Sequence, residues 1–297
     1  MLRYIRILLL IFILALTFYF TGQAGSTPGP NVFLWEIRSG SESVYLLGSI
    51  HVARQDLYPL DRRIEDSFAN SDVLVVEVNI NEIDIMNLQS FIEKGVYLYG
   101  ESIKDHISAK TFELLKKKLS ALGMSIEEVS FYQPWFLALN LELIELAKLG
   151  FNAAFGIDSY FLQKAQGNKD IAELESFQDQ LNVLSGFSDK EQELFLLSTI
   201  SELEMIESYM NELFGAWKAG NVEAMRTMLE AEMDKHPELL PIYDKLFYQR
   251  NLKMTDKIEG FLKKDKSHFV IIGAGHLIGK KGIIQLLKDR GHNPQQL

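Results

Sequence analysis

Two apolar runs near opposite ends of the chain lead into the same short pattern, Gly-x-x-His. The run VYLL leads into residues 48–51, and the run FVII leads into residues 273–276. Each run is typical of a buried strand, and a glycine at a strand end lets the backbone turn sharply or approach a ligand closely. Either histidine alone is better explained as a core residue at a turn. As a pair, they predict two sheet edges that converge on one site containing His51 and His276.

A third candidate, Glu77, interrupts the run VLVVEV at residues 73–78. On a strand the glutamate would share its face with an apolar neighbour, Val75, so this face is expected to be buried. A buried carboxylate is costly unless it is paired or bound to a metal. We therefore favour a role for Glu77 in the site over the alternative, in which it faces solvent on a strand of period two.

Two imidazoles and a carboxylate suit Zn²⁺, or another divalent ion such as Mn²⁺ or Co²⁺, with one position left open for water. A metal bound in this way lowers the pKa of water and polarises a carbonyl group. We expect His51, His276 and Glu77 to hold the metal, with Glu77 as a ligand or as a general base. The chain has no His-Glu-x-x-His pattern, which excludes a standard zincin.

The dipeptide Arg250-Asn251 lies near the start of a predicted helix. Arginine at this place could bind a substrate carboxylate or an oxyanion, and asparagine could donate to a carbonyl group. In the alternative interpretation, Asn251 caps the helix and Arg250 is solvated. Residue chemistry alone leaves both interpretations open.

Five further residues could support the site: Gly48 and Gly273 where the strands end, Asp158, Glu173 and Glu175. Asp158 has the alternative role of capping the helix that begins there, and a solvated face is the default for the two glutamates. The remaining histidines lie in polar or loop contexts and are expected to be exposed: His106, His236, His268 and His292.

The elements that must position these residues include both strands and helices. Apolar runs predict strands over residues 33–38, 44–50, 73–79, 170–174 and 269–272. Helical spacing predicts a short helix over 61–70, a mainly helical region over 81–265 that includes a long helix over 177–217, and a closing helix over 283–290. We expect an α/β (α+β) fold. One domain, residues 32–296, would hold a mixed sheet built from both ends of the chain and a large helical insertion.

Composition restricts the classes of function. The chain has 297 residues, of which 47% are hydrophobic and 24% are charged, so it can bury a substantial core and is not disordered. The net charge of −10 disfavours nucleic acid as a partner, because phosphate binding needs a basic surface. The chain contains no cysteine, which excludes disulfides, thiolate metal ligands and a catalytic thiol.

The N-terminus predicts export from the cytosol. Two arginines precede an apolar run over residues 7–20, and small residues follow. This pattern indicates a signal peptide over residues 1–24, cleaved after Ala24, or else an uncleaved N-terminal anchor. Residues 25–31, rich in glycine, proline and serine, are the expected linker. We therefore expect an extracytoplasmic protein (periplasmic, secreted or held at the outer face of a membrane), with membrane contact only through the anchor if it is uncleaved.

At these residues the chain resembles the TraB/PrgY/GumN family, which includes the Tiki proteins. The resemblance runs in order through most of the chain after the linker, and this order makes it specific. It is carried by residues 45–52, 75–77, 156–158, 172–175 with Gln180, 216–220, 250–251 and 273–277. One small departure is Ser49, where many relatives have threonine. The resemblance implies a mixed sheet with helices, related to the erythromycin-esterase and haem-binding ChaN-like group.

The Tiki branch resembles metal-dependent proteases that need both Gly-x-x-His motifs and a glutamate, here His51, His276 and Glu77. The family's Arg-Asn element matches Arg250-Asn251, which favours a site role for that pair. The leading hypothesis is a metal-dependent hydrolase that cuts peptide bonds, with Arg250 or Asn251 stabilising the oxyanion. The alternative is a non-enzymatic binding protein that sequesters a peptide or a small ligand such as haem. In a third interpretation, the two motifs only order the sheet ends.

Overall fold

The computed structural model describes residues 31–40 and 42–297. The expected signal peptide or anchor over residues 1–24, and all but the last residue of the expected linker over 25–31, lie outside this part of the chain. Within the described residues, no helix is both long enough and apolar enough to cross a membrane.

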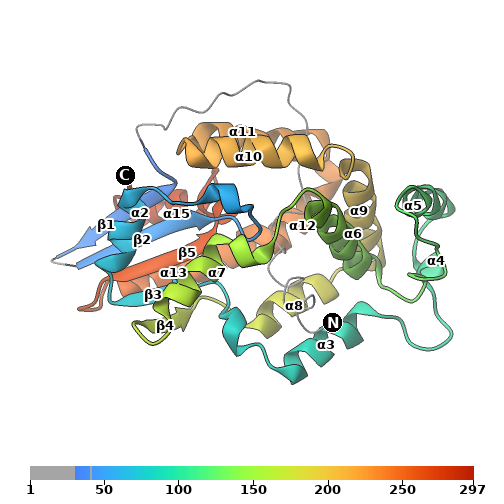
Figure 1. Ribbon diagram of the computed structural model, residues 1–297, viewed down its shortest axis with the longest axis horizontal. Coiled ribbons are helices and arrows are strands. Elements are labelled where there is room, and N and C mark those ends of the chain that lie inside the picture. The colour runs from blue at the N-terminus through green and yellow to red at the C-terminus, as the bar shows by residue number, and fades with distance from the viewer. Residues whose placement is uncertain (1–30, 41) are drawn as a thin grey trace.

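A six-stranded mixed sheet forms the centre of the fold (Figure 1). Its strands are β1 (Leu34–Ser39), β2 (Glu42–Ser49), β3 (Val73–Val76), β4 (Asp170–Glu173), β5 (His268–Gly273) and β6 (Gln295–Gln296). Across the sheet they run in the order β4-β3-β5-β2-β1-β6. Neighbours from β4 to β2 are parallel, whereas β1 and β6 add antiparallel strands at one edge. The prediction of a mixed sheet built from both ends of the chain is confirmed, because β2 and β5 pair at its centre.

The register of this central pair brings the two Gly-x-x-His motifs together. Strands β2 and β5 pair from Val44 with His268 through to Ser49 with Gly273, which are the last residues of the two strands. The carboxyl ends of both strands therefore lie side by side at one edge of the sheet. In open sheets of this kind, ligands bind in the crevice beyond the carboxyl ends of the strands.

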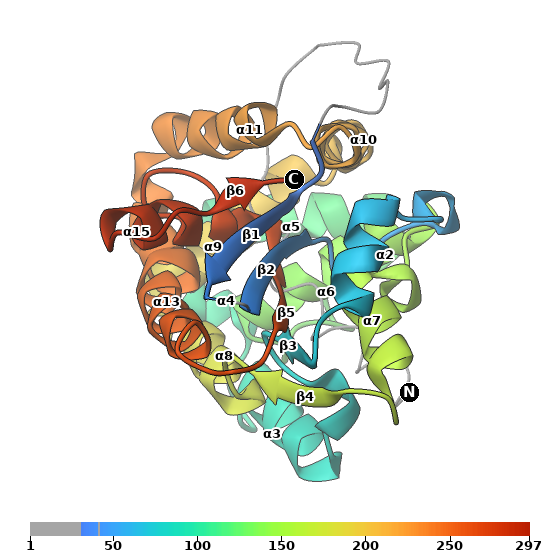
Figure 2. The same ribbon diagram turned by 90° about the vertical axis from the view of Figure 1, so that its left-hand side faces the viewer.

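Helices cover both faces of the sheet, as Figure 2 shows. One face is covered by α2 (Arg62–Ala69) and α7 (Ile157–Ala165), and the other by α13 (Gln249–Phe261) and α15 (Ile283–Asp289). Two more helices, α10 (Ile206–Lys218) and α11 (Val222–Lys235), run along the top in Figures 1 and 2. Because both faces are covered, β5 consists of six consecutive buried residues rather than an alternating pattern.

A second apolar core lies among the helices beyond the carboxyl ends of the strands (Figure 1). Its helices are α3 (Ile85–Gly95), α4 (Ile103–His106), α5 (Ala109–Ala121), α6 (Pro134–Lys148), α8 (Phe177–Ser185), α9 (Asp189–Glu202) and α12 (Leu240–Tyr243). A π-helical segment, Asp244–Tyr248, joins α12 to α13, and the short α14 (Ala274–Leu277) follows β5. The predicted insertion over 81–265 is thus mainly helical, and it returns to the sheet at β4. The predicted domain boundaries stay a prediction.

Three expectations about local structure are wrong: the extent of β3, the long helix over 177–217 and the exposure of His268. β3 ends at Val76, where its pairing with β4 stops, so Glu77 follows the strand instead of lying within it. The long helix expected over 177–217 is divided into three helices; after Gly186, Ser188 caps α9 by accepting a hydrogen bond from the backbone of Glu191.

His268, expected to be exposed, is only 2% exposed. It is the first residue of the central strand β5, where it pairs with neighbours on both sides, and its ring stacks on Phe261 with 4.7 Å between the ring centroids. The other three histidines of that group, His106, His236 and His292, are partly exposed.

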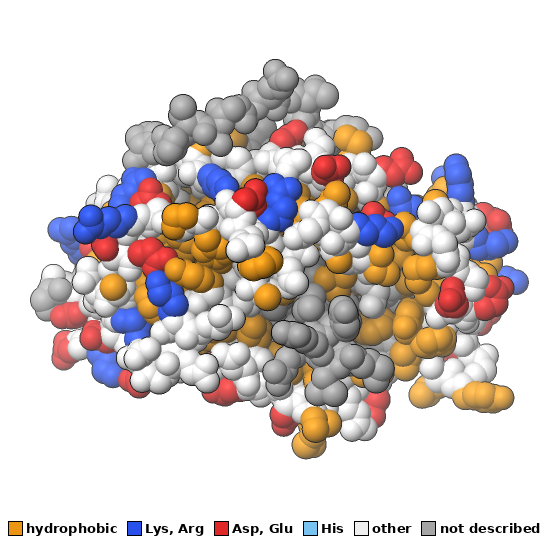
Figure 3. Space-filling model, in the orientation of Figure 1, with side chains coloured by type: hydrophobic (Ala, Val, Ile, Leu, Met, Phe, Trp, Pro, Cys, Tyr) orange, Lys and Arg blue, Asp and Glu red, His pale blue; other side chains and the backbone are white. Residues whose placement is uncertain are grey.

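Both signs of charge are spread over the face that Figure 3 shows, with hydrophobic side chains between them. The strongly exposed hydrophobic residues of the described chain include four within one segment, Ile85, Met86, Leu98 and Tyr99, on α3 and after it. On this face, the acidic excess of the sequence is therefore not gathered into a single patch.

Candidate functional site

His51 follows β2 and is held by the first turn of α7. Its Nδ1 lies 2.8 Å from Oδ2 of Asp158, and the hydroxyl of Ser49 donates to Oδ1 of the same carboxylate at 3.2 Å. Both His51 and Asp158 are buried. A carboxylate accepts hydrogen bonds and does not donate them, so Nδ1 of His51 carries the proton and the neutral ring has its lone pair on Nε2. Asp158 therefore fixes both the tautomer and the orientation of His51.

The close approach of α7 to His51 depends on Gly156. The backbone N–H of Ile157 donates to the carbonyl of Ile50 at 3.1 Å, which brings the start of the helix against the end of β2. A Cβ atom on Gly156 would lie 2.1 Å from the carbonyl oxygen of His51, which leaves no room for a side chain. The N-cap of α7 is Gly156 itself, so the alternative role of Asp158 as the helix cap is wrong.

His276 lies in α14 and is held by Asn251 of α13. Its Nδ1 is 2.5 Å from Oδ1 of Asn251, whose Nδ2 donates to the carbonyl of Lys281 at 2.8 Å. Because the amide nitrogen is used in this way, the amide oxygen faces the ring and accepts from Nδ1. The neutral ring of His276 again has its lone pair on Nε2. The interpretation of Asn251 as a helix cap is wrong, because α13 continues from the π-helical segment that precedes it.

The two imidazoles both have an unpaired ring nitrogen, but they differ in their tendency to become protonated. The Nε2 atoms of His51 and His276 are both buried and have no hydrogen-bond partner among the described residues. Burial and then the positive charge of Arg250 hold the pKa of His276 well below its ordinary value, so this ring is neutral. Burial also opposes protonation of His51, but the Asp158 carboxylate outweighs it and raises the pKa of His51. The charge of His51 also lowers the pKa of His276, so the two rings interact electrostatically.

Glu77 ties the carboxyl end of β3 to that of β5. Its Oε1 accepts a hydrogen bond from the backbone N–H of Gly273 at 2.6 Å, and its Oε2 accepts from Arg250 at 3.0 Å and from Gln180 at 3.2 Å. The carboxylate is 4% exposed. Burial raises the pKa of Glu77, and the charge of Arg250 opposes this rise. Glu77 also interacts electrostatically with His51, which places it at the same site.

Arg250 is buried between two carboxylates. Its Nε lies 3.0 and 2.9 Å from the two oxygens of Glu175, its Nη2 lies 2.5 Å from Glu175 and 3.0 Å from Glu77, and its Nη1 donates to the carbonyl of Leu246 at 2.8 Å. This forked arrangement is the geometry that guanidinium groups form with carboxylates. The interpretation of Arg250 as a solvated side chain is therefore wrong, and so is the default of a solvated Glu175, which is also buried. A role for Arg250 in binding an oxyanion stays a prediction.

The remaining supporting residues act on the backbone around the site. Glu173, on β4, accepts a hydrogen bond from the backbone N–H of Asn79 in the segment after β3. A Cβ atom on Gly48 would lie 2.4 Å from the ring of Phe33, so Gly48 is required by packing inside the core. The carbonyl of Gly48 accepts a hydrogen bond from the indole of Trp217 at 2.6 Å. Gly273 contributes its backbone N–H to Glu77, as described above.

Sequence reasoning did not assign roles to Trp217, Gln180 or Phe247. The ring of Phe247 lies 5.0 Å from that of His276, centroid to centroid. Trp217 and Gln180 fall within segments that carry the family resemblance, which was the available signal for them. Phe247 lies three residues before Arg250 in an apolar helix and gave no signal of its own.

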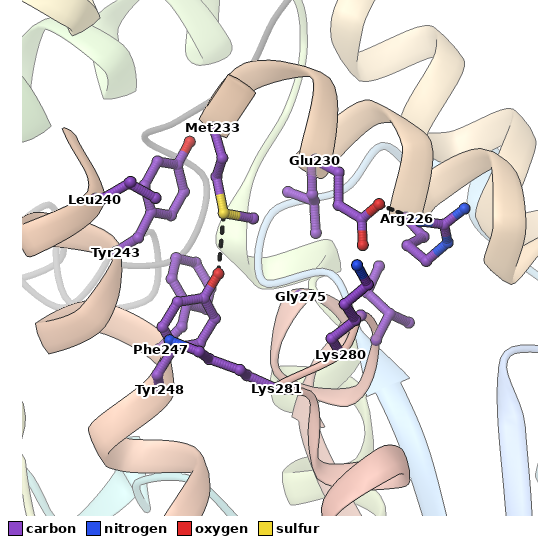
Figure 4. A pocket seen from close by; sticks show the side chains of 13 residues that line it. Arg226, Glu230, Met233, Leu240, Tyr243, Phe247, Tyr248, Gly275, Lys280 and Lys281 are labelled. Atoms are coloured by element: carbon purple, nitrogen blue, oxygen red, sulfur yellow. Dashed lines mark hydrogen bonds and ion pairs between the residues drawn. The ribbon is translucent and has the colours of Figure 1, made fainter. Parts of the chain in front are cut away.

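Two adjoining cavities lie beside His51. A small one of about 40 Å³ is lined by His51, Ser49, Phe247 and Gly275, among others. A larger one of about 390 Å³, drawn in Figure 4, shares Phe247, Gly275 and Leu229 with it. Its volume is within the range of small-molecule and peptide side-chain sites.

The donor atoms fit a metal in part. Buried Nε2 atoms without a protein partner, on rings that are each oriented by a hydrogen bond from Nδ1, are the usual arrangement of metal-binding histidines. Within the part of the chain that the structure describes, however, no group of three or more His, Cys, Asp or Glu residues is arranged to hold a metal ion. The oxygens of Glu77 accept hydrogen bonds from Gly273, Arg250 and Gln180. Its assignment as the third ligand stays a prediction.

The protein is an α/β protein with a mixed sheet. Two adjacent parallel strands of this sheet, β2 and β5, lead into the two Gly-x-x-His motifs at one edge. The chain belongs to the TraB/PrgY/gumN family, whose model matches residues 33–296. This match confirms the family that the ordered motifs indicated.

Curated relatives cover most of the chain. The uncharacterized protein YbaP of Escherichia coli is 28% identical over 258 residues, which are 84% of this chain and 89% of YbaP. An uncharacterized protein of Treponema pallidum is 26% identical over 271 residues, or 86% of this chain and 80% of that protein. The metalloprotease TIKI2 of Xenopus tropicalis is 21% identical over 324 residues, or 92% of this chain and 61% of TIKI2. No solved structure matches the chain.

Proposed function

We propose that the protein is a metal-dependent hydrolase that cleaves peptide bonds, with Nε2 of His51 and Nε2 of His276 as metal ligands. One observation carries the proposal: both Nε2 atoms are buried without a hydrogen-bond partner among the described residues. Leaving two buried ring nitrogens unpaired is costly unless a ligand satisfies them. The similarity to TIKI2, a metalloprotease by name, supports the same function.

The hydrogen bonds to the two rings support a role for both as metal ligands. Asp158 and Asn251 accept hydrogen bonds from Nδ1 of the two rings, which leaves the Nε2 lone pairs available to a ligand. His276 is neutral because burial and the charge of Arg250 lower its pKa, so its Nε2 can act as a ligand. A Zn²⁺, Mn²⁺ or Co²⁺ ion held there would supply Lewis acidity, which polarises a peptide carbonyl and activates water.

Glu77 would complete the site as the third ligand or as the general base. Its raised pKa, caused by burial, is the shift that suits a proton acceptor at neutral pH. Arg250 and Glu175 would hold Glu77 in place, since the guanidinium bridges both carboxylates. Asn251 would act mainly through His276, because both ends of its amide are engaged.

The predicted export segment extends this proposal to location and substrate. Residues 1–24 would carry the protein out of the cytosol, as a cleaved signal peptide or as an anchor, and the substrate would be a peptide or protein met there. The rival proposal is a binding protein that uses the same cavity without turnover. The size of the larger cavity, about 390 Å³, is compatible with that role.

Metal content tests the proposal most directly. Purified protein should contain about one equivalent of a divalent metal by mass spectrometry, or take it up from Zn²⁺, Mn²⁺ or Co²⁺, and should then cleave a peptide library. His51→Ala and His276→Ala should each lose metal and activity while keeping a native circular-dichroism spectrum. His106→Ala, which removes a partly exposed histidine stacked on Tyr97, is the matched control and should keep both.

Three outcomes would contradict the proposal. Protein that takes up no metal, or metal-loaded protein that cleaves no peptide, would favour a binding protein. A folded His51→Ala variant with full activity would remove the histidine pair from the chemistry.

A further inference from the structure

The larger cavity lies between α11, the π-helical segment and the loop after α14. Figure 4 shows its labelled side chains converging from these elements on one space. Its walls are largely apolar and aromatic: Leu229 and Met233 from α11, Leu240 and Tyr243 from α12, and Phe247 and Tyr248 from the π-helical segment. The hydroxyl of Tyr248 donates to the sulfur of Met233 at 2.9 Å, which holds two of these walls together. Such walls favour an apolar side chain as the occupant.

Charged groups stand at the opening of the cavity. Arg226 pairs with two carboxylates, those of Glu230 and Glu223. Lys280 and Lys281 come from the loop after α14 and reach different sides of the cavity (Figure 4). The ammonium of Lys281 lies 4.2 Å from the centroid of the Tyr248 ring. Lys280 is exposed and has no ion-pair partner among the described residues. The three cations that line the cavity face one lining acid, Glu230, and the second acid paired with Arg226, Glu223, which leaves an excess of one positive charge in a chain whose net charge is −10.

The same loop is joined to the candidate catalytic centre. The carbonyl of Lys281 accepts the hydrogen bond from Asn251, the residue that orients His276. Phe247 and Gly275 line both this cavity and the small one beside His51. A chain lying in the larger cavity would therefore pass toward His51.

We propose that this cavity is the substrate-recognition subsite and that it binds a peptide segment in which a large apolar side chain adjoins an acidic one. The apolar side chain packs among Met233, Tyr243 and Phe247, and Lys280 pairs with the adjacent carboxylate. Lys280 is assigned because it is exposed and has no ion-pair partner among the described residues, whereas the ammonium of Lys281 lies over the ring of Tyr248. The inference rests on the proposed function only in placing the bond to be cut at His51 and His276.

Binding without turnover tests this inference independently of hydrolysis. Full-length protein is kept in chelator, and fluorescence anisotropy measures its Kd for labelled Gly/Ser peptides that contain one Phe-Glu, Phe-Gln or Ser-Glu pair. The Phe-Glu peptide should bind about fivefold more tightly than the Phe-Gln peptide, which is the effect of one largely exposed ion pair. The Ser-Glu peptide should bind more weakly still, because it lacks the apolar side chain.

Charge reversal locates the contact. Lys280→Glu should remove the preference for Phe-Glu and favour a Phe-Lys peptide instead. Lys263→Glu makes the same change of charge at an exposed position just after α13 that lines neither cavity, and it should leave the preference intact. Both variants must show the wild-type unfolding temperature.

Equal binding of all peptides, no binding of any peptide, or an equal response to the two charge reversals would overturn the inference. Charge-dependent binding by a protein that cleaves no peptide would keep it and would contradict only the proposed hydrolase. Peptide cleavage that is unaffected by the Lys280→Glu substitution would contradict the inference and keep the proposed hydrolase.

Discussion

The side chain of Glu77 accepts a hydrogen bond from the backbone N–H of Gly273, the first residue of the second Gly-x-x-His motif, at 2.6 Å. This contact joins the ends of two neighbouring parallel strands through a buried carboxylate. Arg250 balances the charge from the other side at 3.0 Å. The position of His276, three residues further along, therefore depends on an acid contributed by a strand nearly two hundred residues earlier in the chain.

Glu77→Gln should lower both stability and activity. The substitution keeps the shape of the side chain but leaves Arg250 with one carboxylate instead of two and brings an amide toward the N–H of Gly273. Breaking a buried ion pair from one side costs about 3 kcal/mol. Chemical denaturation checks this value, and Glu93→Gln, on the exposed side of α3, should change the free energy of unfolding by less than about 0.5 kcal/mol. A Glu77→Gln variant as stable and as active as wild type would mean that the carboxylate is dispensable.

Asn251→Leu should weaken metal binding without removing a ligand. The leucine cannot accept the proton on Nδ1 of His276, so the ring loses its fixed tautomer and orientation. Loss of such a partner typically lowers metal affinity by about 10- to 100-fold. Asn251→Asp is the informative comparison, because it keeps an acceptor for His276 while losing the donor to Lys281.

Competition with a chelating dye measures both affinities. The aspartate variant should hold metal more tightly than the leucine variant. If the two variants bind equally, the hydrogen bond to His276 has no part in holding the metal.

The sequence predicted the strands that lead into the two Gly-x-x-His motifs better than it predicted the contacts of the two histidines. Continuous apolar runs are local signals, so both strands of the central pair and the convergence of His51 with His276 could be inferred without coordinates. Asp158 and Asn251 could not be assigned as their partners. That pairing depends on where α7 and α13 begin relative to the sheet, which is decided by packing between distant segments.

Charged residues were the hardest to place for the same reason. An arginine or a glutamate is solvated by default, and only tertiary structure reveals that Arg250 and Glu175 neutralise each other in the interior. His268 was misplaced because its neighbours in sequence are polar, whereas its neighbours in the sheet are Val44 and Val73. Lys280 and Lys281 come soon after the second Gly-x-x-His motif, but nothing in the sequence indicated that they line a cavity.

Gly156→Ala should destabilise the protein and disturb His51. The added methyl group would lie 2.1 Å from the carbonyl oxygen of His51, so the start of α7 must move away and take Asp158 with it. Overpacking of this kind costs about 1 to 3 kcal/mol. Gly215→Ala is the matched control, because its Cβ atom meets nothing within 4 Å and the residue lies inside α10.

In a helix interior, alanine is favoured over glycine by about 0.5 to 1 kcal/mol, so the control should raise stability slightly. Thermal unfolding checks that Gly156→Ala lowers the unfolding temperature and that Gly215→Ala raises it slightly. The metal content of the two variants checks whether His51 is disturbed. Equal unfolding temperatures would show that the contact between Gly156 and His51 relaxes at no cost.

Glu142 should make stability fall as the pH rises. This residue lies in α6, is buried, and its Oε2 has no hydrogen-bond partner among the described residues. Burial raises the pKa of Glu142 from 4.5 to about 8, so the folded protein keeps the proton that the unfolded chain releases. The folded state then binds more protons than the unfolded state between these two values. The stabilising effect of the proton on Glu142 is complete below pH 4.5 and is lost as the pH rises toward 8.

Glu142→Gln removes this dependence, because the amide keeps the shape of the side chain and does not ionise. At pH 8 the variant should be more stable than wild type by on the order of 3 kcal/mol, and near pH 4.5 the two should be nearly equal. Glu127→Gln, at an exposed position, should leave the pH profile unchanged. Urea denaturation at steps between pH 4.5 and 8 measures all three proteins. Parallel curves for wild type and Glu142→Gln would mean that water reaches Glu142 and that the carboxyl ionises at its ordinary pKa in the folded protein.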